Sequence, residues 1–387
     1  MFKDLIEKPY KTIKALLTSH IVIECDRIPY HFHNVPWEKI INWIRIETSI
    51  LRKPEQPWGW PTHLQIEPAN ICNLRCSLCP VTDGMNRPAG RMDFQIFKKL
   101  IDEIGDYIFI ILFWDWGEPF VNPAIYKMIN HAKHKGIKTI SSTNGHIFAQ
   151  INHADKVIQS GLDTLIIAMD GISQETYKRY RQGGKLKLVL QGIQTLVARK
   201  RILKSQTPML NLRFIVMKHN EHEISQLKEL ARSLGVDALT LKTLNSCSND
   251  TYGEKKSNRE VREETFLPRE DHYKRFKYAP DGKSLKRLRK NPCKNLWNSS
   301  TIHWDGTVCP CTYDYNEKYV LGDLKINRFK DIWFSAPYQS MRRRFRANDK
   351  QFSFCYECSY AYKGGSCNNE TIADAFFNLT ALEQKTS

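Results

Sequence analysis

The sequence contains no long hydrophobic run. Its densest apolar stretch, YIFIILFW at 107–114, lies between Asp106 and Asp115, whereas a helix that crosses a bilayer needs about 18 apolar residues. The opening segment, MFKDLIEKPYKTIKALLTSH, also lacks the continuous apolar core and the small-residue cleavage site of a secretory signal peptide. We therefore expect no transmembrane segment and a cytoplasmic location.

Acidic residues are few relative to basic ones. The 41 Asp and Glu residues stand against 58 Lys and Arg residues, which gives a formal net charge of +17. Such a balance suits a nucleic acid, an anionic surface or a phosphorylated substrate. The excess is spread along the chain, with short clusters at 283–290 and 342–346, and no RNA-binding signature accompanies it. We expect a solvated basic face without a nucleic-acid partner, and an RNA-modifying protein is kept as an alternative.

Three of the 11 cysteines, Cys72, Cys76 and Cys79, lie close together in NICNLRCSLCP, directly after an apolar run. Without a secretion signal, cysteines are better metal ligands than disulfide partners. A structural zinc site closes with four protein ligands, yet no further Cys or His occurs within the next dozen residues. An iron–sulfur cubane held by three thiolates would keep one iron open. The spacing therefore predicts a cluster with a vacant position for a cofactor or substrate.

Strand-like and helix-like segments alternate from about 62 to 245. Segments such as DFQIFKKLIDEIG and PAIYKMINHAKHKG repeat apolar residues at helical intervals. The apolar runs between such segments are THLQIEP, YIFIILFWDW, IKTISSTNG, DTLIIAMDG, LNLRFIVMK and DALTLKTL. This alternation indicates βαβ units and a parallel sheet. Six strands with right-handed crossovers predict an α/β fold, an open (β/α)6 barrel resembling part of a TIM barrel.

Polar residues gather where these predicted strands end, which is the rim that carries chemistry in such barrels. The cysteine loop follows the first run. The later ends contribute WGEP with Glu118, STNG with Thr143 and Asn144, and then Asp170 and, after the sixth run, Cys247. Each of these is an ordinary turn or cap when taken alone. Their joint placement beside the three cysteines favours an active site.

The motifs CNLRCSLCP, GEP, TNG and MDGISQETYKRYR, in this order over about 62–245, resemble those of the radical S-adenosylmethionine (radical SAM) superfamily. The resemblance implies that Cys72, Cys76 and Cys79 hold a [4Fe–4S] cluster. Its fourth iron would be chelated by the amino and carboxylate groups of S-adenosylmethionine. Reduction of this cofactor would then yield methionine and a 5′-deoxyadenosyl radical that abstracts hydrogen from a substrate.

The same resemblance assigns residues that surround the methionine part and the adenine of the cofactor. Leu78 would pack against the adenine, and Gly117, Glu118 and Pro119 would meet the methionine amino group.

Four further residues follow the third and fourth predicted strands. Thr143 and Asn144 would line the cofactor or the substrate, Asp170 ends the fourth strand, and Arg181 would pair with the methionine carboxylate. Many relatives have Ser two residues before the Asp, where this chain has Ala168. The hydrogen bond made by that Ser is therefore missing here or supplied by a neighbour.

A second set of cysteines occupies the C-terminal third of the chain. Its members are Cys293, Cys309, Cys311, Cys355, Cys358 and Cys367. HWDGTV reads as a hairpin turn at Asp305–Gly306. Two cysteines near a hairpin and a later CxxC suit a closed four-thiolate metal site, and the spacing alone leaves a zinc ribbon-like site open.

The order of these motifs resembles the SPASM/twitch extension of radical SAM enzymes, which carries auxiliary iron–sulfur clusters. The full SPASM pattern has further cysteines shortly after the CxxC, and these are absent here at the expected spacing. The resemblance therefore implies one auxiliary [4Fe–4S] cluster for electron transfer. We expect its ligands to be Cys293, Cys311, Cys355 and Cys358, with Cys309 and Cys367 as the spare cysteines, either of which can replace one of the four.

The chain divides into five predicted segments. These are an N-terminal helical extension (1–60), the radical SAM partial barrel (61–247), a charged connector (248–291), a cysteine-rich iron–sulfur domain (292–370) and a C-terminal tail (371–387). In the first segment, the two histidines of YHFHN lie two residues apart. We expect a local turn there rather than a pair of metal ligands.

The predicted function is that of a radical SAM enzyme of oxidoreductase or epimerase type acting on a small molecule such as a sugar, a nucleotide or another metabolite. A flavodoxin- or ferredoxin-type protein would be the reductant. Cys247 is a candidate hydrogen-donating thiol, against the plainer interpretation of an unreactive linker cysteine. Peptide or protein modification is the alternative, although the CSLCPVT stretch lacks the tyrosines that such relatives often carry around the third cysteine. A zinc-stapled scaffold without catalysis is the other alternative.

Overall fold

The computed structural model describes residues 2–82, 84–245, 265–275, 286–356, 358–362 and 372–379, with the backbone alone for 2–9. Within these residues a sheet of ten strands runs in the order β11-β10-β9-β3-β4-β5-β6-β7-β8-β12. Six parallel strands form its centre: β3 (His63–Ile66), β4 (Ile110–Phe113), β5 (Lys138–Thr143), β6 (Thr164–Ala168), β7 (Met209–Val216) and β8 (Ala238–Thr243). The six predicted strands and the partial barrel are therefore confirmed.

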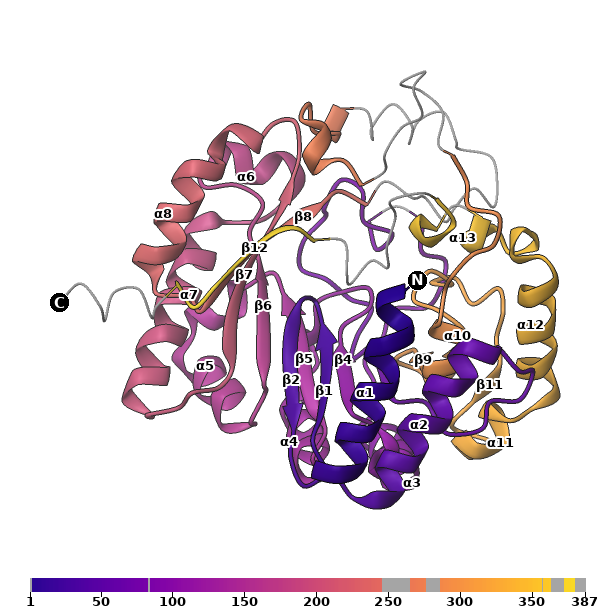
Figure 1. Ribbon diagram of the computed structural model, residues 1–387. Coiled ribbons are helices and arrows are strands. Elements are labelled where there is room, and N and C mark those ends of the chain that lie inside the picture. The colour runs from indigo at the N-terminus through magenta and orange to yellow at the C-terminus, as the bar shows by residue number, and fades with distance from the viewer. Residues whose placement is uncertain are drawn as a thin grey trace.

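Helices on the outer face of the sheet connect these strands (Figure 1). They are α3 (Phe94–Ile104), α4 (Ile125–His134), α5 (Ile151–Gln159), α6 (Gln174–Tyr180), α7 (Leu186–Ile202) and α8 (Ile224–Leu234). Helix α3 illustrates the local rules, because the Asp93 carboxylate caps its first turn by accepting from the Gln95 amide. Apolar residues at helical spacing, such as Phe97, Ile101 and Ile104, then bury one face against the sheet.

Short 3₁₀ turns complete several connections in the described residues. They are η1 (Gly105–Tyr107), η2 (Pro119–Val121), η3 (His146–Ala149), η4 (Glu221–Glu223), η5 (Asp271–Tyr273), η6 (Asp349–Gln351) and η7 (Ser359–Ala361).

An N-terminal hairpin fills the inside of the barrel. Helix α1 (Phe2–Thr18) leads into the antiparallel pair β1 (Ile21–Cys25) and β2 (Ile28–Phe32), and α2 (Trp37–Arg52) follows. Apolar hairpin residues pack in one buried cluster with the strand residues Ile110, Leu112, Ile140 and Ile166. Figure 1 shows the hairpin lying across β4 and β5. The expectation of helices alone over 1–60 was therefore incomplete, because two strands supply the side chains that cover the concave face of the sheet.

The C-terminal region extends the sheet at both edges. On one side β9 (Ser299–Ile302) pairs in parallel with β3, followed by the antiparallel strands β10 (Thr307–Cys309) and β11 (Gly322–Asp323). On the other side β12 (Ile372–Phe377) pairs antiparallel with β8. Thus 371–387 is more than a tail, since part of it completes the barrel edge. The helices of this region are α10 (Asn295–Asn298), α11 (Phe329–Trp333), α12 (Ala336–Ala347) and α13 (Ser353–Tyr356).

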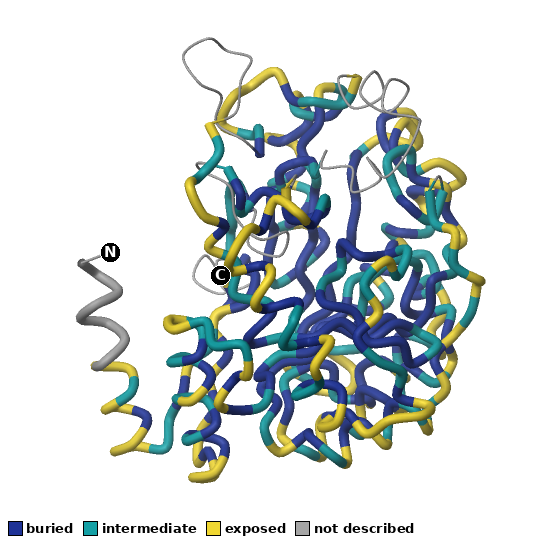
Figure 2. The backbone as a smooth tube through the Cα atoms, turned by 90° about the vertical axis from the view of Figure 1, so that its right-hand side faces the viewer, coloured by how far each residue is buried: buried dark blue, intermediate teal, exposed yellow. Residues whose placement is uncertain are grey.

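Buried residues concentrate on the sheet and on the inner faces of the helices (Figure 2). Among the described residues, no helix combines the length and the hydrophobicity that a membrane crossing requires. The charged connector predicted at 248–291 falls largely outside the described residues.

Candidate active site

The loop after β3 holds the three closely spaced cysteines. The Cys79 amide donates to the Cys76 carbonyl over 3.1 Å, which curls the chain between these two thiols. Burial raises the pKa of the Cys72 thiol to about 11 and that of Cys79 to about 12. Three thiols that lie close enough to influence one another's charge form a soft donor set of the kind that iron–sulfur clusters use. The residues present therefore fit a cluster bound by this loop.

The GEP motif places a buried carboxylate beside this loop. Gly117 has φ +101, and a side chain there would put Cβ 2.4 Å from the Ala69 carbonyl oxygen, so only glycine fits. The Glu118 carboxylate accepts hydrogen bonds from the Thr143 hydroxyl (2.9 Å) and the Asn144 amide (2.8 Å). Burial raises the pKa of Glu118, against the opposing effect of these hydrogen bonds. The GEP and TNG motifs therefore form one hydrogen-bonded unit, and Pro119, the last residue of GEP, begins η2.

Asn144 links this unit to the first cysteine. Its side-chain nitrogen lies 2.7 Å from the Asn73 side-chain oxygen and 3.9 Å from the Cys72 sulfur. The ends of β4 and β5 are thereby connected to the cysteine loop after β3.

Arg181 lies between the fourth-strand carboxylate and the second cysteine. Its Nε donates to Asp170 Oδ2 over 2.6 Å, and its Nη1 lies 3.7 Å from the Cys76 sulfur. Asp170 is fully buried and also accepts from the Ile215 amide of β7 over 2.7 Å. This arrangement holds the guanidinium at the edge of the cysteine loop, and its pairing with a methionine carboxylate stays a prediction.

A cavity of about 220 Å³ opens beside the cysteine loop at the C-terminal ends of the strands. Cys76, Leu78 and Cys79 line one part of it, together with Ala168 and Arg181. The residues that line the rest include Trp114, Trp116, Arg213, Ile215, Lys242, Asn245 and Tyr315.

Sequence reasoning missed the aromatic part of this lining. Trp114 and Trp116 lie two residues apart in WDWGEP, directly after β4. Residues two apart in an extended chain point to the same side, and this spacing is the signal that could have placed both indoles at the C-terminal rim of the barrel. The Trp116 indole also contacts Tyr315 from the C-terminal region, with a ring separation of 5.5 Å. The cavity wall is therefore shared between the barrel and the C-terminal region.

Four cysteines of the C-terminal region line a second, apolar cavity. They are Cys293, Cys311, Cys355 and Cys358. Burial raises the pKa of Cys355 well above its usual value, and the other three thiols raise it further, so all four lie near one another. Aromatic side chains such as Phe345 and Phe354 complete the lining. Four converging thiols in an apolar cavity fit a fully ligated iron–sulfur cluster.

The structure describes one of the two spare cysteines, Cys309. Cys309 is fully buried and its sulfur lies 3.7 Å from His303 Nδ1, outside the residues that line the four-cysteine cavity. Cys247 and Cys367 lie outside the described residues, so the roles predicted for them stay predictions.

A buried polar cluster lies between the two cavities. His303 Nε2 is 3.6 Å from Asp115 Oδ2, and its Nδ1 is 2.8 Å from Glu317. Burial raises the pKa of Asp115 to about 7, against the opposing effect of His303. The Thr312 hydroxyl bonds to Asp115, and the Thr312 carbonyl accepts from the Trp116 indole over 2.8 Å. Because Thr312 follows Cys311, this chain of contacts joins the wall of the first cavity to a residue of the second.

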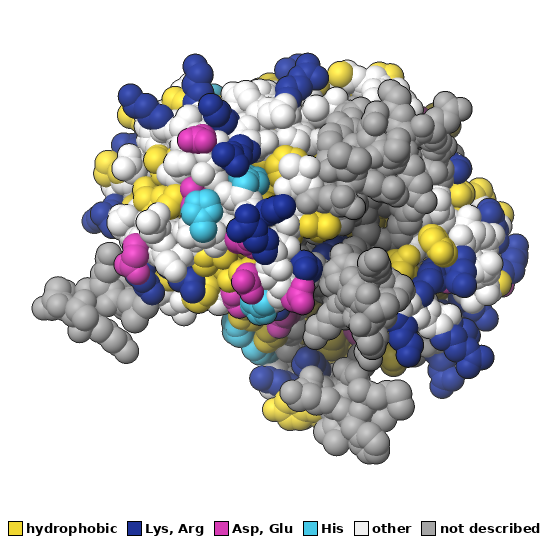
Figure 3. Space-filling model, turned by 90° about the horizontal axis from the view of Figure 1, so that it is seen from above, with side chains coloured by type: hydrophobic (Ala, Val, Ile, Leu, Met, Phe, Trp, Pro, Cys, Tyr) yellow, Lys and Arg dark blue, Asp and Glu magenta, His cyan; other side chains and the backbone are white. Residues whose placement is uncertain are grey.

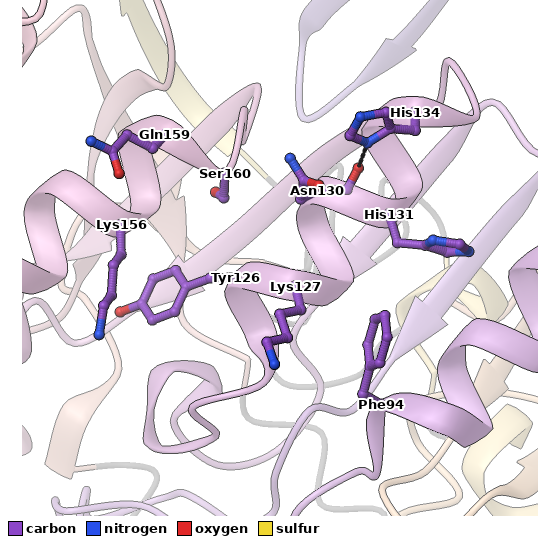
Figure 4. A pocket seen from close by; sticks show the side chains of 9 residues that line it. All are labelled: Phe94, Tyr126, Lys127, Asn130, His131, His134, Lys156, Gln159 and Ser160. Carbon is purple, nitrogen blue, oxygen red and sulfur yellow. Dashed lines mark hydrogen bonds between the residues drawn. The ribbon is translucent and has the colours of Figure 1, made fainter.

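The outer helical face carries a separate hollow (Figure 4). Phe94 of α3, Tyr126 and His131 of α4 and Lys156 of α5 are among its lining residues. His131 pairs with Asp102 over 2.7 Å. The hollow lies on the side of the sheet away from the cysteines, and its polar contacts hold neighbouring helices together.

Comparison with models of known protein families identifies the family of this chain. The Radical SAM superfamily model matches residues 66–237, and the SPASM iron–sulfur cluster-binding domain model matches residues 293–359. The chain belongs to the radical SAM superfamily. Its radical SAM domain binds a [4Fe–4S] cluster and S-adenosylmethionine, and its SPASM domain indicates auxiliary iron–sulfur binding.

Curated relatives of this radical SAM protein carry several different names. The tungsten-containing aldehyde ferredoxin oxidoreductase cofactor-modifying protein of Pyrococcus furiosus is 24% identical, over 77% of this chain and 87% of that protein. The AdoMet-dependent heme synthase of Methanosarcina barkeri is 29% identical, over 43% of this chain and 46% of that protein. The probable GTP 3′,8-cyclase of Methanocaldococcus jannaschii is 26% identical, over 64% of this chain and 84% of that protein.

Solved structures of radical SAM proteins share the fold. SuiB of Streptococcus suis bound to its precursor peptide SuiA matches with a TM-score of 0.54 and 16% identity, over 95% of this chain and 86% of that one. Native anSMEcpe with bound AdoMet matches with a TM-score of 0.52 and 14% identity, over 84% of this chain and 95% of that one.

Proposed function

We propose that this radical SAM protein is an enzyme that abstracts hydrogen from an anionic small molecule, with a single auxiliary cluster providing an electron path. Oxidoreductase and epimerase outcomes both fit this proposal. The observation that carries it is the lining of the cavity of about 220 Å³. One part of that lining contains Cys76 and Cys79, and another contains cationic and aromatic side chains.

The cations of this lining favour an anionic substrate group. Arg213 of β7 and Lys242 of β8 both line the cavity. The Arg213 guanidinium is buried and paired with Asp26 of the hairpin turn over 3.0 Å, and the half-buried Lys242 contributes a second positive charge to the cavity wall. Positive charges on a cavity wall attract anionic ligands, so a phosphate or carboxylate of the substrate would be stabilised there.

The aromatic side chains favour a substrate with a flat ring. The indoles of Trp114 and Trp116 offer large surfaces that stack on planar groups and exclude water from the reacting carbon. When bound, the reduced cluster and S-adenosylmethionine supply a 5′-deoxyadenosyl radical. Around them Glu118 accepts hydrogen bonds at the methionine end, and Arg181 presents a positive charge beside Cys76. These residues bind and orient the cofactor and the substrate.

The names of the relatives agree with a small-molecule substrate. Two of the curated relatives are named for heme synthesis and GTP cyclisation. The SuiB complex holds a peptide, which keeps peptide modification as the alternative, but at this identity the likeness concerns the fold alone.

The test is activity-guided fractionation with the reconstituted enzyme. A cell extract is separated by ultrafiltration into small molecules and peptides, and each fraction is assayed anaerobically for stimulated release of 5′-deoxyadenosine. We expect the stimulating compound in the small-molecule fraction, bound by an anion exchanger, and a loss of stimulation in Lys242→Met. A stimulating compound that is retained with the peptides, or that passes the anion exchanger, contradicts the proposal.

We further propose that an acidic electron-carrier protein of flavodoxin or ferredoxin type docks beside the auxiliary cluster. Segment 286–291 passes over this region, because the Leu288 amide donates to the Ala361 carbonyl and Asn291 Nδ2 to the Cys355 carbonyl. Its exposed side chains include Arg289 and Lys290.

Helix α12 adds to this basic surface. Phe345 lines the four-cysteine cavity, and its neighbour Arg346 is exposed. Lys53 connects segment 286–291 with α12, since its ammonium lies over the Phe345 ring and donates to the Asn291 carbonyl. Figure 3 shows basic side chains on the right-hand side of the molecule, where α12 lies in Figure 1. A basic surface of this kind attracts an acidic partner at a rate that falls with ionic strength.

Stopped-flow reduction tests this docking surface. A Cys72→Ala/Cys76→Ala/Cys79→Ala background isolates the auxiliary cluster, which is then reduced by flavodoxin. We expect Arg289→Glu with Arg346→Glu to slow this reduction about 10-fold or more at low salt, whereas reduction by dithionite is unchanged. The matched control is Arg201→Glu with Lys204→Glu at the exposed end of α7. Equal rates in the two double variants would contradict the docking surface.

A further inference from the structure

Three histidines meet at the open end of the N-terminal hairpin. His31 is the fourth residue of β2, His33 follows the strand directly, and His20 precedes β1. Residues two apart on a strand point to the same face, which brings His31 and His33 together. The expectation of a local turn at these histidines was wrong, because β2 continues through Phe32 in register with Ile21.

The ring nitrogens of this trio lie at distances close to those of a metal site. His20 Nε2 is 3.2 Å from His31 Nδ1, and each of the three histidines offers a nitrogen within 4.8 Å of those of the other two. A tetrahedral zinc ion with Zn–N bonds of about 2.0–2.1 Å separates its ligand nitrogens by roughly 3.3 Å. The first pair already has this spacing. The three rings stack nearly parallel, with interplanar angles of 8–13°, so they must turn about their side-chain bonds to direct three nitrogens at one ion.

We propose that His20, His31 and His33 bind a divalent transition-metal ion of the zinc class. Imidazole nitrogens suit zinc, nickel and copper, and three of them leave a fourth position for water.

The site has a structural consequence for the barrel. His20 follows α1, and the other two histidines belong to the strand that returns from the hairpin turn. A shared ion would therefore fasten the end of α1 to β2. The opposite end of the same hairpin carries Asp26, which pairs with Arg213 of the cavity lining. The ion would thus hold the hairpin in place from its outer end, remote from both sets of clustered cysteines.

Zinc titration of the holoprotein, with its iron–sulfur clusters loaded, tests the site. Calorimetry measures the stoichiometry, and zinc-edge X-ray absorption identifies the ligands. We expect about one zinc per chain, coordinated by nitrogen at about 2.0–2.1 Å and without sulfur at about 2.3 Å. His31→Ala and His33→Ala should each weaken binding at least about 10-fold, while His134→Ala on α4 should bind as the wild type does.

Several results would overturn the proposal. They are the absence of calorimetric zinc binding, a sulfur shell around the bound zinc, and undiminished binding in His31→Ala and His33→Ala. Circular dichroism of each variant shows whether the fold is intact. His31→Asn, which keeps a polar side chain on the strand, provides the second test if His31→Ala proves unfolded. Loss of zinc binding in a folded His31→Asn protein supports the site, and retained affinity contradicts it.

Discussion

Gly117 shows at the residue scale how one missing side chain shapes the candidate site. Its positive φ and its approach to the Ala69 carbonyl leave no space for Cβ. The next residue, Glu118, can therefore turn toward Thr143 and Asn144, whose hydrogen bonds fix its carboxylate. The motif was recognisable in the sequence, but the contact that demands glycine comes from a loop nearly 50 residues earlier and is visible only in the structure.

We expect Gly117→Ala to weaken S-adenosylmethionine binding about 10- to 100-fold, because a strained φ costs about 1–3 kcal/mol and the loop must also move. Equilibrium dialysis under anaerobic conditions measures the affinity. Gly136→Ala is the matched control, since Gly136 also has positive φ (+67) but no atom within 4 Å of the added Cβ. Equal affinity in the two variants would argue against this role for Gly117.

His303 predicts a pH dependence of stability. Burial alone would lower its pKa, but Cys309, Asp115 and Glu317 outweigh burial and raise the pKa well above 6.5. The folded protein therefore keeps a proton that the unfolded chain releases near pH 6.5. Its contribution to the free energy of unfolding is complete below that pH and is lost as the pH rises through the folded pKa.

We expect the urea midpoint of the wild type to fall between about pH 6 and about pH 8, and the decrease to be smaller in His303→Gln. The exposed His134→Gln serves as the control. A decrease of the same size in His303→Gln and in the wild type would mean that this histidine does not hold the proton.

Some site residues could be predicted from the sequence and others could not. The cysteine loop, GEP and TNG are local motifs with defined spacing, so their positions were predictable. Trp114 and Trp116 were hidden in a run that reads as a strand end. The pairing of Asp26 with Arg213 joins residues nearly 190 positions apart, and no local pattern encodes such a contact.

At the element scale, the hairpin β1–β2 is an element that the local sequence patterns did not predict. Its two-residue turn, Asp26–Arg27, has φ values of +52 and +62 but lacks the Asn-Gly or Asp-Gly sequence that usually marks such turns. Strand β12 was hidden for a different reason, because the short stretch IADAFF becomes a strand only through pairing with β8. The six central strands were predictable because each carries its own apolar run and turn.

The hairpin is anchored by the Tyr30 hydroxyl, which lies 2.8 Å from the Thr164 hydroxyl in a buried position. We expect Tyr30→Phe to lower the free energy of unfolding by about 1–3 kcal/mol, since Thr164 loses its buried partner. Urea titration gives this value. Tyr10→Phe, at a residue that is 65% exposed, is the control. An unchanged midpoint in Tyr30→Phe would show that this bond does not anchor the hairpin.

At the scale of the whole molecule, one continuous sheet connects the two thiol-lined cavities. Strand β9 of the C-terminal region pairs with β3, whose end leads into the cysteine loop. Trp116 and Thr312 then bridge the two regions near the cavity walls. The order of the two cysteine sets was predictable from the sequence. Their connection through a shared sheet was not, because the strands that join lie more than 230 residues apart.

The measurement that tests the central claim most directly is cleavage of S-adenosylmethionine by the anaerobically reconstituted protein. With dithionite, the wild type should release 5′-deoxyadenosine and methionine and contain about eight irons per chain. Cys76→Ala should release none while it keeps about four irons in the auxiliary cluster. Undiminished cleavage in Cys76→Ala, or none in a fully loaded wild type, would contradict the account.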